Sequence, residues 1–167
     1  MGNGPDVDSE HLFNGSALNA IDAKGRLSVP AIFRAQLELR VADKTLFIGR
    51  HETEPCLIAY DAVYNSMLAA EVRRRRARDE EKGVDLRAHF NRSRRASGFA
   101  DPVSYDANGR ILMPAPLRKL GQIEDLVLFV GSFDFIELWN PRLALESADA
   151  DLRELAQMRL DERGGRK

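Results

Sequence analysis

Two arginines that directly follow a glycine are the side chains of this sequence best placed to bind an anion. Arg26 ends a D-A-K-G-R segment and Arg110 ends a D-A-N-G-R segment. A guanidinium offers two parallel donors, which match O6 and N7 of guanine or two oxygens of a phosphate. Lys24 and Asn108 stand at the same position of the two segments. Two interpretations of these four side chains stay open: they contact DNA, or each arginine pairs with the aspartate of its own segment.

The same segments contain the residues that close a tight turn. An aspartate at the first position accepts hydrogen bonds from N–H groups ahead of it, and a glycine supplies the positive φ. The loop-shaping residues are therefore Asp22, Gly25, Asp106 and Gly109. A catalytic pair of carboxylates would have to be buried and close together, whereas each aspartate is better explained by its turn.

Other catalytic chemistry has little support. The sequence lacks G-x-x-x-x-G-K-[ST], a G-x-G-x-x-G after a strand, and G-x-S-x-G. Cys56 enters an apolar stretch, so we interpret it as a packing residue, and a single cysteine forms no intrachain disulfide. The histidines at 11, 51 and 89 have no metal-ligand spacing. We predict no enzyme, no cofactor, no metal and no small-molecule substrate.

An internal repeat organises the chain around these turns. Asp22–Arg34 and Asp106–Arg118 match at seven of thirteen positions without a gap. Looser similarity follows downstream, so we predict two modules, residues 16–63 and 100–143. Each module should contain a β-hairpin, a short helix that begins after a proline, and a closing pair of strands. The two short helices are expected at Ala31–Leu37 and Ala115–Leu120.

The segments outside the modules are expected to be helical or loose. In the connector, residues 64–99, the apolar spacing predicts a helix over 62–78, a break at 79–83 and a second short helix after Asp85. The last segment, 144–167, should hold one helix over Leu143–Leu160 and a tail. Residues 1–12 are expected to form a flexible extension.

Charge is balanced overall but concentrated in the connector. The chain has 25 Lys+Arg against 26 Asp+Glu, yet residues 72–95 carry ten basic and four acidic side chains. The Arg73–Arg76 run covers every side of a helical turn, so a solvated surface is the first interpretation and attraction to phosphate the second. No apolar run could span a bilayer and no secretion signal is present, so a cytoplasmic protein without a membrane partner is expected.

The twin D-x-x-G-R motifs, each followed by an apolar triplet and a proline, closely resemble the MraZ family. The resemblance extends from Phe13 to Trp139. It implies an α+β fold in which tandem AbrB/SpoVT-like swapped hairpins, both supplied by one chain, form a pseudo-twofold barrel. It also implies ring-like homo-oligomers that bind promoter DNA of the division and cell-wall gene cluster, usually as repressors of their own operon.

With this resemblance, the hypothesis is a nucleoid-associated regulator that binds tandem direct repeats in double-stranded promoter DNA. Its predicted DNA contacts are Lys24, Arg26, Asn108 and Arg110. Two alternatives stay open: an AbrB-like antitoxin, whose appended tail would neutralise a toxin, and a ring-forming structural protein. Arg34 and Arg118 also match between the copies and are second choices for ligand contact, because a hydrogen bond within the fold explains them equally well.

Overall fold

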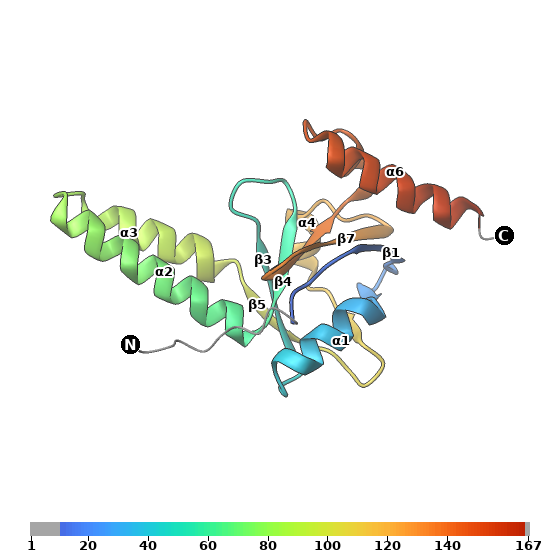
Figure 1. The fold of residues 1–167 in the computed structure, drawn as a ribbon, viewed down its shortest axis with the longest axis horizontal. Coiled ribbons are helices and arrows are strands. Elements are labelled where there is room, and N and C mark those ends of the chain that lie inside the picture. The colour runs from blue at the N-terminus through green and yellow to red at the C-terminus, as the bar shows by residue number, and fades with distance from the viewer. Residues whose placement is uncertain (1–10, 166–167) are drawn as a thin grey trace.

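The computed structural model describes residues 11–165, which form an α+β fold around an antiparallel sheet (Figure 1). The six-stranded sheet has the order β1-β7-β8-β4-β3-β5, and β2 and β6 form a separate two-stranded ribbon. The strands are β1 Ser16–Ala20, β2 Arg26–Ser28, β3 Thr45–Arg50, β4 Leu57–Tyr60, β5 Asp101–Ser104, β6 Arg110–Leu112, β7 Leu126–Ser132 and β8 Phe135–Trp139.

The two copies of the repeat exchange strands. β1 pairs with β7, β5 pairs with β3, β4 pairs with β8, and β2 pairs with β6, always antiparallel. Exchanging the first copy for the second therefore gives the same strand order, read from the opposite edge of the sheet. Within the first predicted hairpin the turn closes as expected, but the bridge between Ile21 and Leu27 is the one β contact between its arms among the described residues. Because the copies share one sheet, the module boundaries stay a prediction.

A short helix follows each proline, as the sequence predicts. Helix α1 spans Ala31–Arg40, three residues beyond the expected end, and α4 spans Ala115–Leu120. Pro30 and Pro114 have φ of −55° and −58°, values that the ring fixes and that suit the start of a helix. Each helix buries its apolar side in one core that both copies line. The largest fully buried side chains include Phe13, Phe33, Phe129, Leu27, Leu46, Ile48, Leu57, Ile136 and Leu138.

The connector forms a two-helix arm that projects from the sheet (Figure 1). The arm consists of α2 Ala62–Glu81, α3 Leu86–Ser93 and a π-helical turn, η1 Arg94–Gly98. The break after α2 falls near the expected place, and α3 begins after Asp85, whose carboxylate accepts a hydrogen bond from Arg87 N at 2.9 Å. None of the three helices has a buried residue. The arm is therefore held by few core contacts.

A buried ion pair ties the start of the arm to α1. Arg40 Nε donates to Asp61 Oδ2 at 2.6 Å, and the two side chains are 3% and 2% exposed. Asp61 also caps α2 by accepting from Tyr64 N at 3.1 Å. Arg40 donates further to the His11 carbonyl at 2.9 Å and lies over the Phe13 ring. One carboxylate thus fixes a helix start and neutralises a buried cation.

The prediction of one C-terminal helix over Leu143–Leu160 is wrong, because the segment forms two helices. Helix α5 spans Pro141–Leu145 and α6 spans Ala150–Gly165. Between them the Asp149 carboxylate accepts from Asp151 N at 2.9 Å, a local hydrogen bond that competes with a continuous helix. Helix α6 then packs Leu152 and Ala156 against the cluster that contains Trp139.

Most of the expected flexible extension, residues 1–12, lies outside the described residues, and Phe13 directly after it is fully buried. No helix within residues 11–165 is both long and apolar enough to cross a membrane.

Candidate nucleic-acid interface

The loop before β2 is a tight turn built by Asp22. Its Oδ1 accepts hydrogen bonds from Lys24 N and Arg26 N, both at 2.9 Å. Gly25 N donates to the Asp22 carbonyl at 3.0 Å, and Gly25 has a φ of +87°. The aspartate therefore accepts the hydrogen bonds that close the turn, and the glycine has the positive φ that the turn requires.

The loop before β6 repeats this geometry. Asp106 Oδ1 accepts from Asn108 N at 2.9 Å and from Arg110 N at 3.0 Å, and Gly109 has a φ of +77°. Lys24 and Asn108 are both exposed at the outer side of their loops. The two copies thus present different side chains on the same backbone.

The arginines pair with their own loop aspartates but remain accessible. Arg26 Nε donates to Asp22 Oδ2 at 2.6 Å, and Arg110 Nε donates to Asp106 Oδ2 at 2.9 Å. The arginine side chains are nevertheless 67% and 62% exposed, and within residues 11–165 their terminal nitrogens make no hydrogen bond. An exposed pair of this kind adds little stability, so the guanidiniums can accept a second anionic partner at small cost.

The loop carboxylates stay charged at lower pH than an ordinary aspartate. The backbone N–H of Arg26, followed by its guanidinium, lowers the pKa of Asp22. The backbone N–H of Arg110 does the same for the pKa of Asp106, with a smaller contribution from the guanidinium. A charged carboxylate held in this way orients the arginine beside it.

The β2–β6 ribbon places both arginines on one exposed face. Arg26 lies opposite Leu112, and Ser28 lies opposite Arg110. The central residues Leu27 and Ile111 point into the core, so the four others point outward. Arg26 and Arg110 are diagonal neighbours across the ribbon, so their Cβ atoms are about 7–8 Å apart.

Arg34 and Arg118 support the loops of the opposite copy. Arg118 Nη1 donates to the Asp22 carbonyl at 2.6 Å, and Arg34 Nη1 donates to the Asn108 carbonyl. Both side chains are only partly exposed. The structure thus favours a hydrogen bond within the fold for these second-choice residues. Their matched positions in the repeat were the signal, but the sequence did not reveal which loop each arginine would hold.

Within residues 11–165 the structure keeps the two loop aspartates apart and places the single cysteine in the core. Asp22 and Asp106 are 41% and 44% exposed and belong to loops at opposite ends of the ribbon. Cys56 is 3% exposed beside Trp139, and burial raises the pKa of its thiol far above the ordinary value. In the same described part of the chain no group of three or more His, Cys, Asp or Glu side chains could hold a metal ion.

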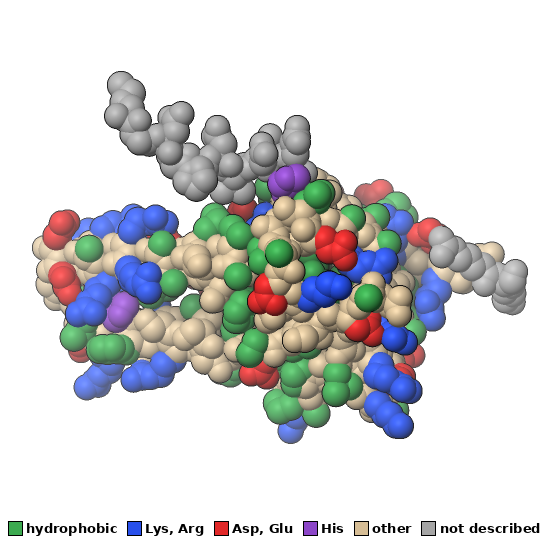
Figure 2. Space-filling view, turned by 90° about the horizontal axis from the view of Figure 1, so that it is seen from below, with side chains coloured by type: hydrophobic (Ala, Val, Ile, Leu, Met, Phe, Trp, Pro, Cys, Tyr) green, Lys and Arg blue, Asp and Glu red, His purple; other side chains and the backbone are tan. Residues whose placement is uncertain are grey.

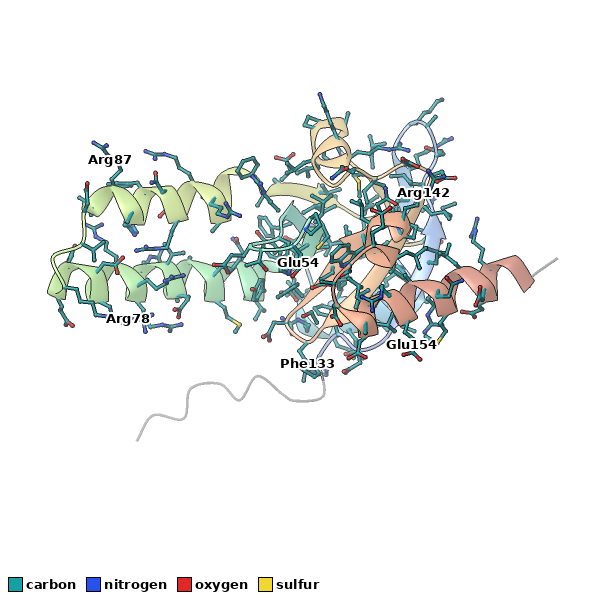
Figure 3. The ribbon with its side chains drawn as sticks, turned by 90° about the horizontal axis from the view of Figure 1, so that it is seen from above. Glu54, Arg78, Arg87, Phe133, Arg142 and Glu154 are labelled. Carbon is teal, nitrogen blue, oxygen red and sulfur yellow. The ribbon has the colours of Figure 1, made fainter. Side chains whose placement is uncertain are left out.

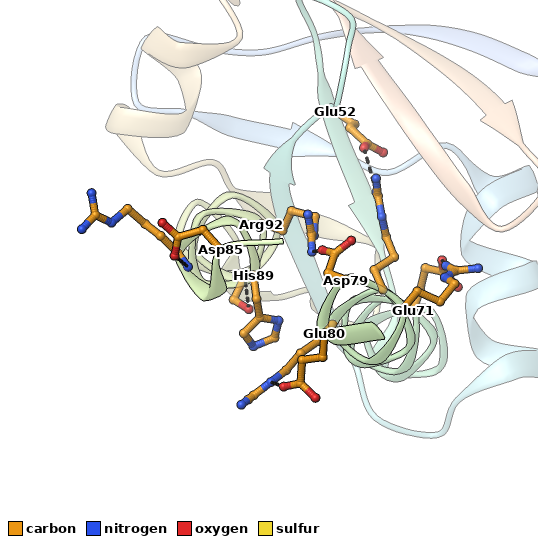
Figure 4. A network of polar contacts seen from close by, with 12 residues as sticks. Glu52, Glu71, Asp79, Glu80, Asp85, His89 and Arg92 are labelled. Carbon is orange, nitrogen blue, oxygen red and sulfur yellow. Dashed lines mark hydrogen bonds and ion pairs between the residues drawn. The ribbon is translucent and has the colours of Figure 1, made fainter. Parts of the chain in front are cut away.

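Four of the nine arginines of the arm pair with acids of the arm. Arg74 bonds to Glu71 at 2.7 Å and Arg76 to Glu80 at 3.0 Å, while Arg92 of α3 pairs with Asp79 of α2 (Figure 4). Basic side chains still cover much of the arm in Figure 2, and Arg78 and Arg87 lie on its opposite outer edges in Figure 3. The arm is therefore a solvated surface whose positive charge is partly neutralised.

Fold and loops together define a class: an α+β protein in which two intertwined copies of one unit display paired arginine loops on a two-stranded ribbon. The chain belongs to the MraZ family. The model of that family, described as "MraZ protein, putative antitoxin-like", matches residues 98–161.

Curated relatives cover most of the chain and carry the name "Transcriptional regulator MraZ". The protein from Pseudomonas savastanoi pv. phaseolicola is 30% identical over 145 residues, which is 84% of this chain and 88% of the relative. The Shewanella oneidensis protein is 28% identical over 138 residues, 83% of this chain and 86% of the relative. A Pseudomonas aeruginosa protein (strain LESB58) is 29% identical over 147 residues, 87% of this chain and 91% of the relative.

Proposed function

We propose that this protein is a transcription regulator that binds promoter DNA through its twin loops. The observation that carries the proposal is the exposure of Arg26 and Arg110 on one face of the ribbon, each behind the same turn. Lys24 and Asn108 assist from the loops. The name of the curated relatives supports a role in transcription, which is not a class of enzyme.

The dimensions of the ribbon suit the major groove. A groove about 12 Å wide admits a two-stranded ribbon, and a separation of about 7–8 Å lets the two arginines reach different base pairs. On binding, each guanidinium exchanges solvent for guanine or phosphate while Nε keeps its loop carboxylate. The hydrogen bonds from Arg34 and Arg118 hold the loops in place beforehand, which lowers the entropy cost of binding.

We also assign the chain to the AbrB/SpoVT-like swapped-hairpin architecture, with residues 16–63 and 100–143 as the two halves of a pseudo-twofold barrel. The pairing of β1 with β7 and of β5 with β3 supports this assignment, since each copy lends its first strand to the other.

The proposed operator consists of tandem direct repeats upstream of the protein's own division and cell-wall gene cluster, where binding represses transcription. We call one copy of the repeated DNA sequence a word. One ribbon makes few contacts with a word, so neighbouring ribbons in a homo-oligomeric ring would raise the effective concentration of ribbons at each further word. Words that face one side of the duplex have centres about 10 bp apart.

A packed C-terminal helix favours the regulator over the antitoxin. An antitoxin of this architecture would use an appended tail to hold its toxin, but α6 buries Leu152 and Ala156 against the sheet of its own chain.

Fluorescence anisotropy with the upstream region of the gene tests the proposal. The variant Arg26→Ala/Arg110→Ala should bind at least tenfold more weakly, because a good bidentate base contact contributes about 1–3 kcal/mol. Its melting temperature should stay nearly unchanged, since both side chains are exposed. The matched control is Arg87→Ala/Arg94→Ala on the arm, which should bind like the parent.

Spacing provides a second readout. A single word, tandem words one helical turn apart and tandem words with about 5 bp inserted should bind weakly, tightly and weakly. If the double loop variant binds as the parent does, the loops are not the DNA contacts. Equal affinity for all three duplexes would refute the tandem arrangement alone.

A further inference from the structure

A large apolar side chain stands among the polar ones on the outward face of the ribbon. Leu112 is 59% exposed and lies directly across from Arg26. It leans over the first loop, where its Cδ1 would lie 3.7 Å from a Cβ on Gly25. The core does not need this leucine, because its two neighbours in the chain, Ile111 and Met113, are the residues buried there.

The two ends of the ribbon are equivalent in backbone but different in side chains. Exchanging the copies carries Arg26 onto Arg110, whereas it carries Ser28 onto Leu112 and Lys24 onto Asn108. One end of the ribbon therefore offers a guanidinium, a leucine and an ammonium group. The other end offers a guanidinium, a hydroxyl and an amide.

These differences match different base edges. In the major groove an apolar side chain packs on the C5-methyl of thymine, a serine hydroxyl tolerates several bases, and an asparagine amide suits adenine. We infer that Leu112 contacts a thymine methyl next to the base that Arg26 contacts. Because Ser28 stands at the equivalent position, the opposite end of the ribbon has no preference for thymine. The inference rests on the proposed function and adds a specificity-determining residue to it.

The consequence is polarity. A ribbon with identical ends would bind a word equally well in either direction and would prefer a palindrome. Because Leu112 and Ser28 make the ends unlike, the preferred word is asymmetric, and every ribbon of an assembly lies on its own word in one direction. Such recognition suits direct repeats rather than inverted ones.

Replacement of single thymidines by deoxyuridine tests the contact, because it removes only the methyl group. Duplexes from the upstream region, with one replacement each, are compared by anisotropy. The replacement at one position should weaken DNA binding by the parent protein about fourfold, the effect expected from losing one buried methyl group. Leu112→Ala should bind the unmodified duplex equally weakly and lose nothing more at that position. Ser28→Ala, the matched control, should keep the parent's sensitivity.

A symmetrised ribbon tests the polarity. The variant Ser28→Leu/Asn108→Lys gives both ends the same three side chains, so it should prefer a palindromic word made from two copies of the half that contains the methyl-sensitive position. The parent should prefer its natural word. Because the substituted positions are exposed, melting temperatures should agree with the parent's.

The outcomes separate the two proposals. A parent that binds the upstream region but shows no methyl-sensitive position, or one that persists in Leu112→Ala, overturns the inference and leaves the proposed function standing. A symmetrised variant that still prefers the natural word overturns the polarity. A parent that does not bind the region at all overturns both.

Discussion

Adding one methyl group at each of four glycines should separate backbone strain from steric conflict in the loops. Gly25, Gly83 and Gly109 have φ of +87°, +68° and +77°, a conformation that costs an alanine roughly 1–2 kcal/mol. The alanine restricts the unfolded chain and returns about 0.4–1 kcal/mol. Strain alone therefore leaves a net loss of about 1 kcal/mol. Gly98, without positive φ, has no neighbouring described atom within 4 Å of the point where a Cβ would lie and serves as the unstrained control.

Steric conflict then distinguishes the two arginine loops from Gly83, where no described atom would lie within 4 Å of a Cβ. A Cβ on Gly109 would lie 2.6 Å from Arg34 Nη1, the flexible end of a side chain that can move if it gives up its bond to Asn108. That bond adds about 0.5–1.5 kcal/mol. A Cβ on Gly25 would lie 2.7 Å from the Met113 carbonyl, which belongs to the backbone. Shifting it strains the hydrogen bond from Met113 N to the Gly25 carbonyl at 2.8 Å.

We expect Gly98→Ala to gain about 0.4–1 kcal/mol of unfolding free energy, because the alanine there only restricts the unfolded chain. The expected losses are about 1 kcal/mol for Gly83→Ala and about 2 kcal/mol for Gly109→Ala. Gly25→Ala should lose about 3–4 kcal/mol, because overpacking adds to the strain. At about 2–4 °C per kcal/mol, differential scanning calorimetry should show the melting temperature of Gly25→Ala falling by roughly 6–16 °C. A Gly25→Ala protein as stable as Gly83→Ala would refute the idea that the Met113 carbonyl is rigidly held.

Two further predictions concern buried and exposed carboxylates. Asp61→Asn should lower the unfolding free energy by about 3–5 kcal/mol, because the Arg40 guanidinium would stay buried without its counter-charge while the helix cap is kept. Urea unfolding measures this, with the exposed cap variant Asp85→Asn as a control that should change little; comparable losses in the two variants would contradict the prediction. Asp22 and Asp106 should titrate below the ordinary aspartate value of 3.8, so the stability they contribute is present above that pH and is lost as the pH falls through their folded pKa values. Carboxyl NMR titration tests the sign, and a pKa at or above 3.8 for either residue would show that its loop hydrogen bonds do not persist in solution.

The sequence determined the local geometry of the candidate site. The aspartate, glycine and proline of each copy restrict backbone angles or offer hydrogen bonds within a few residues, so the turns and the helices after Pro30 and Pro114 could be predicted from residue type alone. The repeat itself marked Arg26 and Arg110 as equivalent. The C-terminal helix was predicted less well, because the Asp149 carboxylate accepts a local hydrogen bond from Asp151 N inside the predicted helix.

The tertiary structure alone decided which strands are partners and which side chains share a face. The sequence pattern was equally compatible with strands paired inside each copy, yet β1 joins β7 and β2 joins β6. That exchange brings Leu112 opposite Arg26 and takes Arg118 to the loop at Asp22, pairings between residues far apart in the chain. Strand pairing depends on burying the apolar residues of both copies in one common core. The free energy of that burial belongs to the assembled core rather than to any one segment, which is why no local pattern contained it.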